Sequence, residues 1–353
     1  NTRSIASILV GFNNPDLPWS ELERALSDRV SDRVSDRVSD RVSASRHSPP
    51  HPGDGSDSPA WGRRRAPYQP PTALARRGAA AVPYAELHCH SNFSFLDGAS
   101  HPEELVEEAA RLGLEALALT DHNGFYGVVR FAEAARSIGL PTVFGAELTL
   151  ETALPPRTTT VRTGPPDPEG RHLVVIARDP TGYARLGTAI SRAQMAGEKA
   201  APRLAPGDLD ELASTGRDHI LVLTGCRKGT VPAALLADGP AAARRELDAL
   251  VDRFGRGGVA VELWDHGDPL DSARNDALAH LGITAGVEVV ATNNVHYATS
   301  AQRRLATALA AVRARRSLDE IDGWLPGGGL AHIRSGAEQA RRFARYPGAV
   351  EAA

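Results

Sequence analysis

Seven short runs of apolar, β-favouring residues occur along the chain from Tyr84 onward, separated by Ala-, Leu-, Glu- and Arg-rich stretches with helical spacing. Short apolar runs are typical of buried strands, and longer amphipathic stretches are typical of helices. Repeated strand–helix alternation predicts an α/β fold with a parallel sheet, either open and doubly wound or closed into a (β/α) barrel. Seven strands favour the barrel. The expected strands are 84–88, 115–119, 142–147, 172–177, 219–224, 258–263 and 287–292.

The helix expected at 102–112 carries recognisable signals at both ends. Ser100 followed by Glu103 fits a capping box at its start. Gly113 suits the left-handed conformation that ends many helices. We therefore predict that Ser100 caps this helix and that it ends before Gly113.

The first 83 residues have a different composition from the rest of the chain. Residues 27–42 repeat "SDRV" four times, and Pro, Ser, Gly and Arg dominate the following segment. Such a segment buries too little apolar surface to offset the entropy of ordering, so we predict a mostly disordered leader at 1–83. A short helix in "LPWSELERALSDR", with Ser20 as cap and Glu23 completing a capping box, is the expected exception. The repeat is either a charged interaction tail or, as we favour, replication slippage in a tolerant tail.

Composition excludes several classes of protein. Apolar residues make up 42% of the 353 residues, which is enough for a substantial core. The net charge of −3 provides no overall basic field, so any nucleic-acid contact must be local. Two cysteines, Cys89 and Cys226, rule out a disulfide framework and favour a cytoplasmic location. No apolar run approaches the ~18 residues of a membrane span, so no membrane association is expected.

Histidines and acids follow the ends of the predicted strands. His88 and His90 are two apart, so on a strand both side chains face the same side while Cys89 points away. In a (β/α) barrel the residues at the carboxyl ends of the strands meet at one mouth. We therefore expect a shared site formed by the residues at these ends and at the start of the fourth strand, namely His88, His90, Asp97, Asp121, His122, Glu147, His172, Cys226, Asn294 and His296.

Each of these residues also has a simpler interpretation. His172 could be a hydrogen-bonded core residue, and Cys226 a small apolar filler. Asp121 could cap a helix at 127–137, Asp97 could belong to an ordinary turn, and Glu147 could pair with Arg178. All of these interpretations would have to hold together on successive strands, so we favour a metal site. The histidines without this placement receive no ligand role: His47, His51, His101, His219, His266, His280 and His332.

The types of ligand restrict the metal. Imidazole and carboxylate with at most one thiolate suit zinc, manganese or iron. Eight or nine candidate ligands exceed what one tetrahedral ion uses, so we expect two or three divalent ions. Neighbouring ions of this kind support phosphoester hydrolysis and generate hydroxide near neutral pH, so no side chain is assigned as the nucleophile.

Five segments closely resemble the N-terminal PHP (polymerase and histidinol phosphatase) domain of bacterial C-family DNA polymerases: "ELHCHSNFSFLDGAS", "ALTDHNGFYGVVRFAEAA", "VFGAELTL", "LTGCRKG" and "VATNNVHY". Two others, "NPDLPWSELERAL" and "RRLATALAAVRARRSLDEIDGWLP", are similar to the error-prone, damage-induced branch of that family. The resemblance implies a distorted seven-stranded barrel over 84–298 with up to three metal ions, followed at 299–353 by the start of the polymerase region. The implied ligands are His88, His90, Asp97, His122, Glu147, His172, Cys226 and His296, with Asp121 supporting them.

Two departures from the family pattern affect the expected activity. Asn294 stands where metal-replete members carry an acid, and an amide oxygen is a weaker ligand than a carboxylate. The Asp triad of the polymerase centre, which would use magnesium, does not occur in these residues. We therefore expect metal binding with weak or no 3′–5′ exonuclease activity, and no polymerisation by this chain alone.

Three functional hypotheses remain open at this stage. The favoured one is the PHP portion of an error-prone polymerase used in DNA replication, translesion synthesis and repair, whose implied partners are DNA, the sliding clamp and mutagenesis accessory proteins. The others are a free-standing PHP phosphatase and a purely structural PHP scaffold. The arginines at 303–304, 313–316 and 341–345 face either DNA or the polymerase palm, or else form a solvated helix face.

Overall fold

The computed structural model describes residues 68–74, 81–150, 170–197, 202, 204–321 and 329–353. The chain divides into two compact units, and the fold below is that of the unit that contains Pro70–Ala353. The expected helix with Ser20 and Glu23 and the SDRV repeat lie outside the described residues, and the leader at 1–83 stays a prediction. The boundary expected between 298 and 299 also stays a prediction, because both sides belong to this unit.

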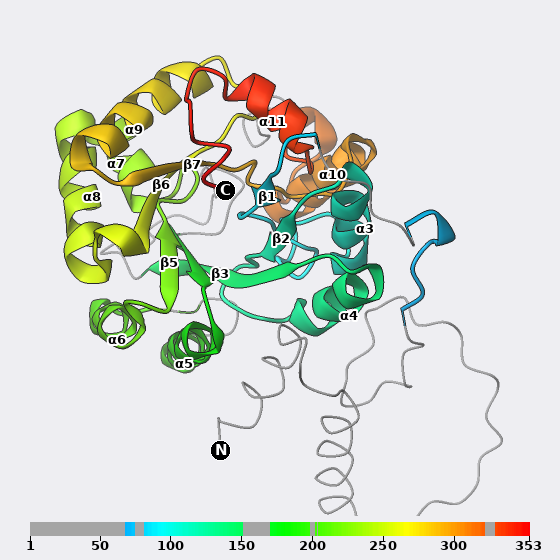
Figure 1. The fold of residues 1–353 in the computed structure, drawn as a ribbon, viewed down its shortest axis with the longest axis horizontal. Helices are drawn as coiled ribbons and strands as arrows, with labels where there is room; N and C mark the ends of the chain where they lie inside the picture. The colour runs from blue at the N-terminus through cyan, green and yellow to red at the C-terminus, as the bar shows by residue number, and fades with distance from the viewer. Residues whose placement is uncertain (1–67, 75–80, 151–169, 198–201, 203, 322–328) are drawn as a thin grey trace, which may run out of the picture. The chain divides into compact units, whose positions relative to one another are not determined.

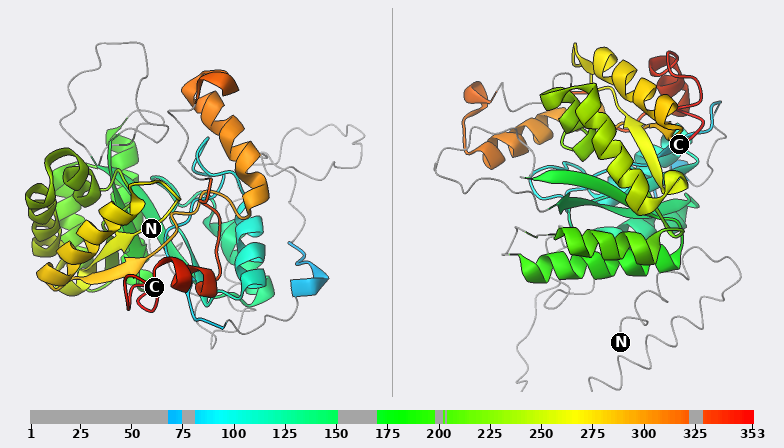
Figure 2. Two further views of the ribbon diagram at one scale, coloured as in Figure 1. Left: turned by 90° about the horizontal axis from the view of Figure 1, so that it is seen from above. Right: turned by 90° about the vertical axis from the view of Figure 1, so that its left-hand side faces the viewer.

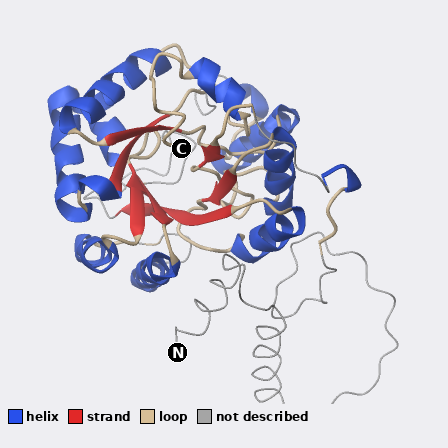
Figure 3. Ribbon diagram, viewed as in Figure 1, coloured by secondary structure: helices blue, strands red, loops and turns tan. Residues whose placement is uncertain are grey.

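All seven expected strands are present, and they lie side by side in the order in which they occur along the chain (Figure 1). Beyond the strands, Cys89 and Val295 form a parallel bridge. The His90 N–H donates to the Val295 carbonyl, and the Val295 N–H donates to the His88 carbonyl, both at 2.8 Å. The segments that follow the first and last strands therefore meet, and the sheet curls into a distorted barrel (Figure 3). The strands are β1 (Ala85–Glu86), β2 (Ala116–Leu119), β3 (Thr142–Leu150), β4 (Arg171–Ala177), β5 (Ile220–Leu223), β6 (Val259–Leu263) and β7 (Glu288–Ala291).

The expectation of an entirely parallel sheet is wrong for β4. This strand pairs antiparallel with both β3 and β5, while the pairs β1–β2, β2–β3, β5–β6 and β6–β7 are parallel. An antiparallel neighbour needs no crossover helix, so a count of strands and helices does not reveal its direction. The reversal pairs His172, near the start of β4, with Thr149, near the end of β3.

Helices cover the outside of the barrel (Figure 2). Inside it, side chains from β4 to β7 form one apolar cluster of Val174, Ile176, Leu223, Ala260 and Val290. Val174 and Ile176 share the parity of His172 and therefore face the same side of the sheet. The helices are α3 (Pro102–Leu112), α4 (Val128–Ile138), α5 (Pro180–Ala196), α6 (Pro206–Gly216), α7 (Thr230–Asp238), α8 (Pro240–Phe254), α9 (Asp271–Ala285), α10 (Arg303–Ala314) and α11 (Gly336–Arg342). Within the described segments, no helix combines the length and the apolar character that a bilayer crossing requires.

The ends of α3 confirm one local prediction and correct another. Gly113 adopts the left-handed conformation with φ of 75° and ends the helix after Leu112, as expected. The cap is His101 rather than Ser100, and the Glu104 carboxylate accepts the His101 N–H at 2.7 Å. Ser100 instead donates to Gln302 and accepts from the Ala298 N–H, each at 2.8 Å. A long-range contact has thus displaced the local capping role of Ser100.

Candidate metal centre

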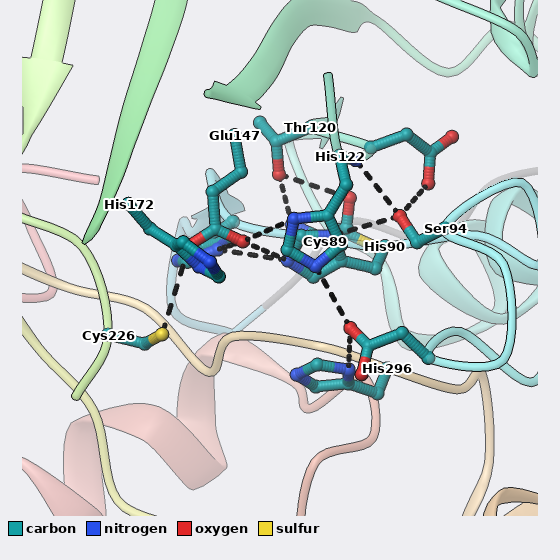
Figure 4. Close-up of polar contacts among 12 residues, drawn as sticks. Cys89, His90, Ser94, Thr120, His122, Glu147, His172, Cys226 and His296 are labelled. Carbon is teal, nitrogen blue, oxygen red and sulfur yellow. Dashed lines mark hydrogen bonds and ion pairs between the residues drawn. The ribbon is translucent and has the colours of Figure 1, made fainter. Parts of the chain in front are cut away.

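Glu147 lies at the middle of a cluster of imidazoles (Figure 4). Its side chain is buried near the carboxyl end of β3. Oε2 lies 3.2 Å from His90 Nε2, 3.2 Å from His122 Nδ1 and 3.8 Å from His88 Nε2. Oε1 lies 3.1 Å from His172 Nδ1 and 3.8 Å from the Cys226 sulfur. These six residues form what we call the Glu147 half of the centre.

Asp97 is the hub of a second group of contacts. Its Oδ2 lies 3.1 Å from His122 Nε2 and 3.2 Å from His296 Nδ1. Its Oδ1 accepts a hydrogen bond of 2.6 Å from the Arg313 guanidinium. Asp97, His296 and Arg313 form the Asp97 half, and His122 connects the two halves through its two ring nitrogens.

The barrel brings these residues together from distant parts of the chain. His88 and His90 follow β1, His122 follows β2, and Cys226 follows β5. Because β4 is reversed, His172 at its start lies at the same rim as the carboxyl ends of the other strands. All nine sequence-predicted ligands therefore lie at or line one mouth.

Asp121 supports the loop that carries Asp97, and the alternative that it caps a helix is wrong. Its carboxylate accepts from the Ser91 N–H, the Ser91 hydroxyl and the Ser94 hydroxyl, each at 2.7 Å. Burial raises the pKa of Asp121, and these hydrogen bonds oppose the rise. Helix α4 begins after Gly127 without a side-chain cap.

The alternative pairing of Glu147 with Arg178 is also wrong. Arg178 donates to the Gly257 carbonyl at 2.6 Å. Glu147 contacts imidazoles instead, which explains its ionisation. Burial acts to raise the pKa of Glu147, but the charges of His172 and His122 hold that pKa well below its usual range.

Glu262 was missed by the sequence analysis. It is fully buried in β6, and its Oε1 lies 2.7 Å from His88 Nδ1. Burial acts to lower the pKa of His88, but the neighbouring Glu262 and Glu147 carboxylates raise it to about 10. A carboxylate that holds the outer nitrogen of a histidine orients the other nitrogen toward a metal. The sequence feature that could have identified Glu262 is the presence of a charged residue inside the apolar run "VAVEL".

His90 and Asp97 are held in the protonation states that a metal requires. Burial, followed by the charge of His122, lowers the pKa of His90 to about 3, so its imidazole is neutral. Burial acts to raise the pKa of Asp97, but His296, His122 and Arg313 hold it well below its usual range. A neutral imidazole and an ionised carboxylate are the forms that bind metal ions.

Asn294 has an unusual backbone and an unsatisfied oxygen. Its φ is 39°, a region that asparagine tolerates better than most residues. Its side chain lines a pocket at the mouth of the barrel, and Oδ1 is buried without a hydrogen-bond partner among the described residues. An amide oxygen in this state is available as a metal ligand.

The described side chains fit a group of divalent ions. Three overlapping sets place their ligand atoms within 4.8 Å of one another: His88, His90 and Glu147; His90, Asp97 and His122; and His122, Glu147 and His172. Ligand bonds of about 2.0–2.1 Å in tetrahedral geometry would place neighbouring ligand atoms roughly 3.3 Å apart. The separations of 3.1 to 3.8 Å around Glu147 match that spacing.

The cluster lies at the base of a pocket with a helical wall. One face of α10 contributes Arg303, Ala306, Thr307, Ala310 and Arg313. His266, which sequence reasoning set aside, also lines the pocket, and its Nε2 lies 2.6 Å from the Asn293 carbonyl. Burial is the main reason that the pKa of His266 falls to about 3. The sequence did contain an indication of this position, because His266 follows shortly after the sixth predicted strand, 258–263.

The other histidines without an assigned role lie elsewhere or outside the described residues. His219 is half-exposed and pairs with Asp179 at 2.6 Å. His101 caps α3, and neither His280 nor His332 belongs to the ligand sets found among the described residues. His47 and His51 lie outside the described residues.

Comparison with known proteins agrees with this geometry. Residues 86–266 match the family model described as PHP domain. The chain is 52% identical over 97% of its length to an error-prone DNA polymerase of Mycolicibacterium paratuberculosis, and 51% identical over 98% to one of Mycobacterium tuberculosis. It spans 29% of the length of each of these relatives. With the family model covering half of the sequence, the chain belongs to the PHP domain family.

Proposed function

We propose that this chain is the PHP-domain portion of an error-prone DNA polymerase that acts in DNA replication, translesion synthesis and repair in the cytoplasm. We further propose that its metal centre hydrolyses phosphodiester bonds at DNA 3′ ends with low activity. The error-prone DNA polymerases that are 52% and 51% identical to this chain support its assignment to such a polymerase. The Glu147 carboxylate, in contact with four imidazoles from three segments of the barrel, carries the second proposal.

The side chains at the mouth have separate tasks in this reaction. Bound divalent ions would polarise a phosphoryl oxygen and acidify water. Glu147 and the surrounding imidazoles hold them, while Glu262 orients His88 and Asp121 orients the loop of Asp97. Arg227 and Arg303 line the same pocket and would bind a phosphate group of the substrate.

Zinc, manganese or iron is the proposed occupant of the centre, because imidazoles and carboxylates dominate the ligand set. Magnesium would serve the polymerase centre of the longer protein. DNA, the sliding clamp and mutagenesis accessory proteins are the proposed partners. The relatives are error-prone DNA polymerases, which supports the first of these partners.

The test is nuclease activity on a primed DNA with a mismatched 3′ end, measured with manganese or zinc present. Glu147→Gln removes the charge that the ions share, so we expect the rate to fall by about a hundredfold or more. Glu211→Gln on α6 is the matched control, because that carboxylate is half-exposed and pairs with Arg192. Equal rates for the Glu147→Gln variant and the wild type would contradict the proposal.

A structural scaffold is the second candidate, and Asn294 favours it. A neutral ligand in place of an acid weakens a metal centre. If the module is only a scaffold, protein purified without chelator should contain at most one equivalent of zinc, manganese or iron by mass spectrometry. Two or three equivalents would instead support the hydrolytic function.

A further inference from the structure

Arg313 reaches the metal centre from a helix that follows the region matched by the family model. Its guanidinium donates to Asp97 Oδ1 at 2.6 Å, and both side chains are largely buried, with 15% and 4% exposed. Its Nε is buried without a hydrogen-bond partner among the described residues. Arg313 is therefore not a solvated helix residue, which was one of three interpretations that the sequence left open, beside a contact with DNA and a contact with the polymerase palm.

Helix α10 presents one face to the pocket. Arg303, Ala306, Ala310 and Arg313 are spaced three to four residues apart and share that face, and Thr307 lies beside them. Small side chains lie between the two arginines. Of the side chains on this face, that of Arg313 reaches Asp97.

The charges at the mouth are unevenly distributed. Two carboxylates, Asp97 and Glu147, line the pocket together with three guanidinium groups, those of Arg227, Arg303 and Arg313. The Glu147 carboxylate contacts imidazoles and the Cys226 thiol. Asp97, in contrast, is directly paired with an arginine. The contacts of Glu147 are therefore with groups that can release their protons when a metal ion binds, whereas the guanidinium beside Asp97 stays charged.

We propose that Arg313 acts as a built-in cation that neutralises Asp97, so that the resident metal ions are held in the Glu147 half and the Asp97 half binds a divalent ion only weakly. This inference rests on the proposed metal centre. A divalent ion bound through Oδ2 of Asp97 would share that carboxylate with the Arg313 guanidinium. The two positive charges would then lie on either side of one carboxyl group, where they repel each other strongly inside a protein.

Metal titration of the full chain by calorimetry with Mn²⁺ tests this proposal. Arg313→Gln removes the positive charge and keeps hydrogen-bonding capacity. We expect it to bind one more equivalent than the wild type or to tighten the weakest site by about tenfold or more, because a unit charge near the ion is removed. Arg313→Lys keeps the charge and should resemble the wild type. Arg304→Gln on the exposed side of α10 is the matched control and should also resemble it.

Thermal unfolding gives a second measurement that does not depend on activity. Without metal, Arg313→Gln leaves Asp97 as a buried carboxylate without its arginine, so the variant should unfold at a lower temperature. Added Mn²⁺ should raise its melting temperature more than that of the wild type. Equal stoichiometry, affinity and metal-induced shift in the wild type and Arg313→Gln would overturn the proposal. Weaker metal binding in Arg313→Gln would overturn it too, because Arg313 would then help Asp97 to bind an ion.

The experiments separate the proposed role of Arg313 from the proposed hydrolytic function. If the wild type binds metal but does not cleave DNA, the hydrolytic function fails while the effect of Arg313 on metal affinity stands. If the wild type cleaves DNA and Arg313→Gln leaves metal binding unchanged, only the role of Arg313 fails.

Discussion

Asn294 is the residue at which the centre lacks an expected negative charge. Its Oδ1 has no hydrogen-bond partner among the described residues, and its backbone conformation is one that aspartate also tolerates. We therefore expect Asn294→Asp to tighten metal binding by about tenfold, because a carboxylate replaces a neutral oxygen. Titration with Mn²⁺ followed by calorimetry measures the change.

Asn294→Gly provides the control for this substitution. Glycine accepts a φ of 39° without strain, so the variant removes the oxygen while keeping the backbone. It should bind metal no better than the wild type. An Asn294→Asp variant with the same affinity as Asn294→Gly would show that this position does not reach an ion.

We expect His88 to make metal binding depend on pH. Its pKa in the metal-free fold is about 10, against 6.5 for an unperturbed histidine, because the Glu262 and Glu147 carboxylates outweigh the effect of burial. The protonated form therefore stabilises the metal-free fold fully below pH 6.5, and this contribution is lost as pH rises through about 10. A metal ion must displace this proton, so its affinity should increase by about tenfold per pH unit between pH 7 and 9.

Calorimetry in two buffers with different ionisation enthalpies measures the proton released. About one proton per protein should come from His88, since His90 is already neutral above pH 3. Metal affinity that stays constant between pH 7 and 9 would show that His88 does not hold its proton in the metal-free protein.

At the scale of elements, the loop between β1 and α3 depends on a glycine. A Cβ atom at Gly98 would lie 1.9 Å from the Ser91 carbonyl oxygen, so the loop that carries Asp97 would have to move. Gly98→Ala should destabilise the protein by about 1–3 kcal/mol and weaken metal binding. Urea unfolding monitored by circular dichroism measures the loss of stability.

Gly207 in α6 is the matched control for that substitution. A Cβ atom there would meet nothing within 4 Å, so Gly207→Ala should be neutral or slightly stabilising. If both alanine variants unfold at the same urea concentration as the wild type, the close approach of Gly98 to Ser91 does not limit the size of the residue at position 98.

Element prediction succeeded where the signals were local. All seven strands and the end of α3 at Gly113 were predicted from short-range pattern. The direction of β4 and the cap of α3 were not, because both depend on partners distant in sequence. β4 pairs antiparallel with β3 and β5, and the Ser100 hydroxyl is used by Gln302 and Ala298.

At the scale of the whole described unit, the candidate metal centre contains side chains in or directly after β1, β2, β3 and β4. A ligand that binds only the folded state at a hundred times its dissociation constant adds about 2.7 kcal/mol of stability. Removing the metals with a chelator should therefore lower the melting temperature by roughly 5–10 °C. Differential scanning calorimetry measures this change. Restoring Mn²⁺ should reverse it, and identical melting curves with and without chelator would contradict a resident metal.

The sequence by itself determined the strands, most of the residues at the mouth and the likeness to PHP domains, because apolar periodicity and motif spacing are local properties of the chain. Only the tertiary structure decided that β4 is antiparallel to β3 and β5, that Glu262 orients His88, and that Arg313 pairs with Asp97. These contacts join residues up to 216 positions apart. No short-range pattern encodes such a pairing, because it arises from how the barrel closes and how α10 packs over its mouth.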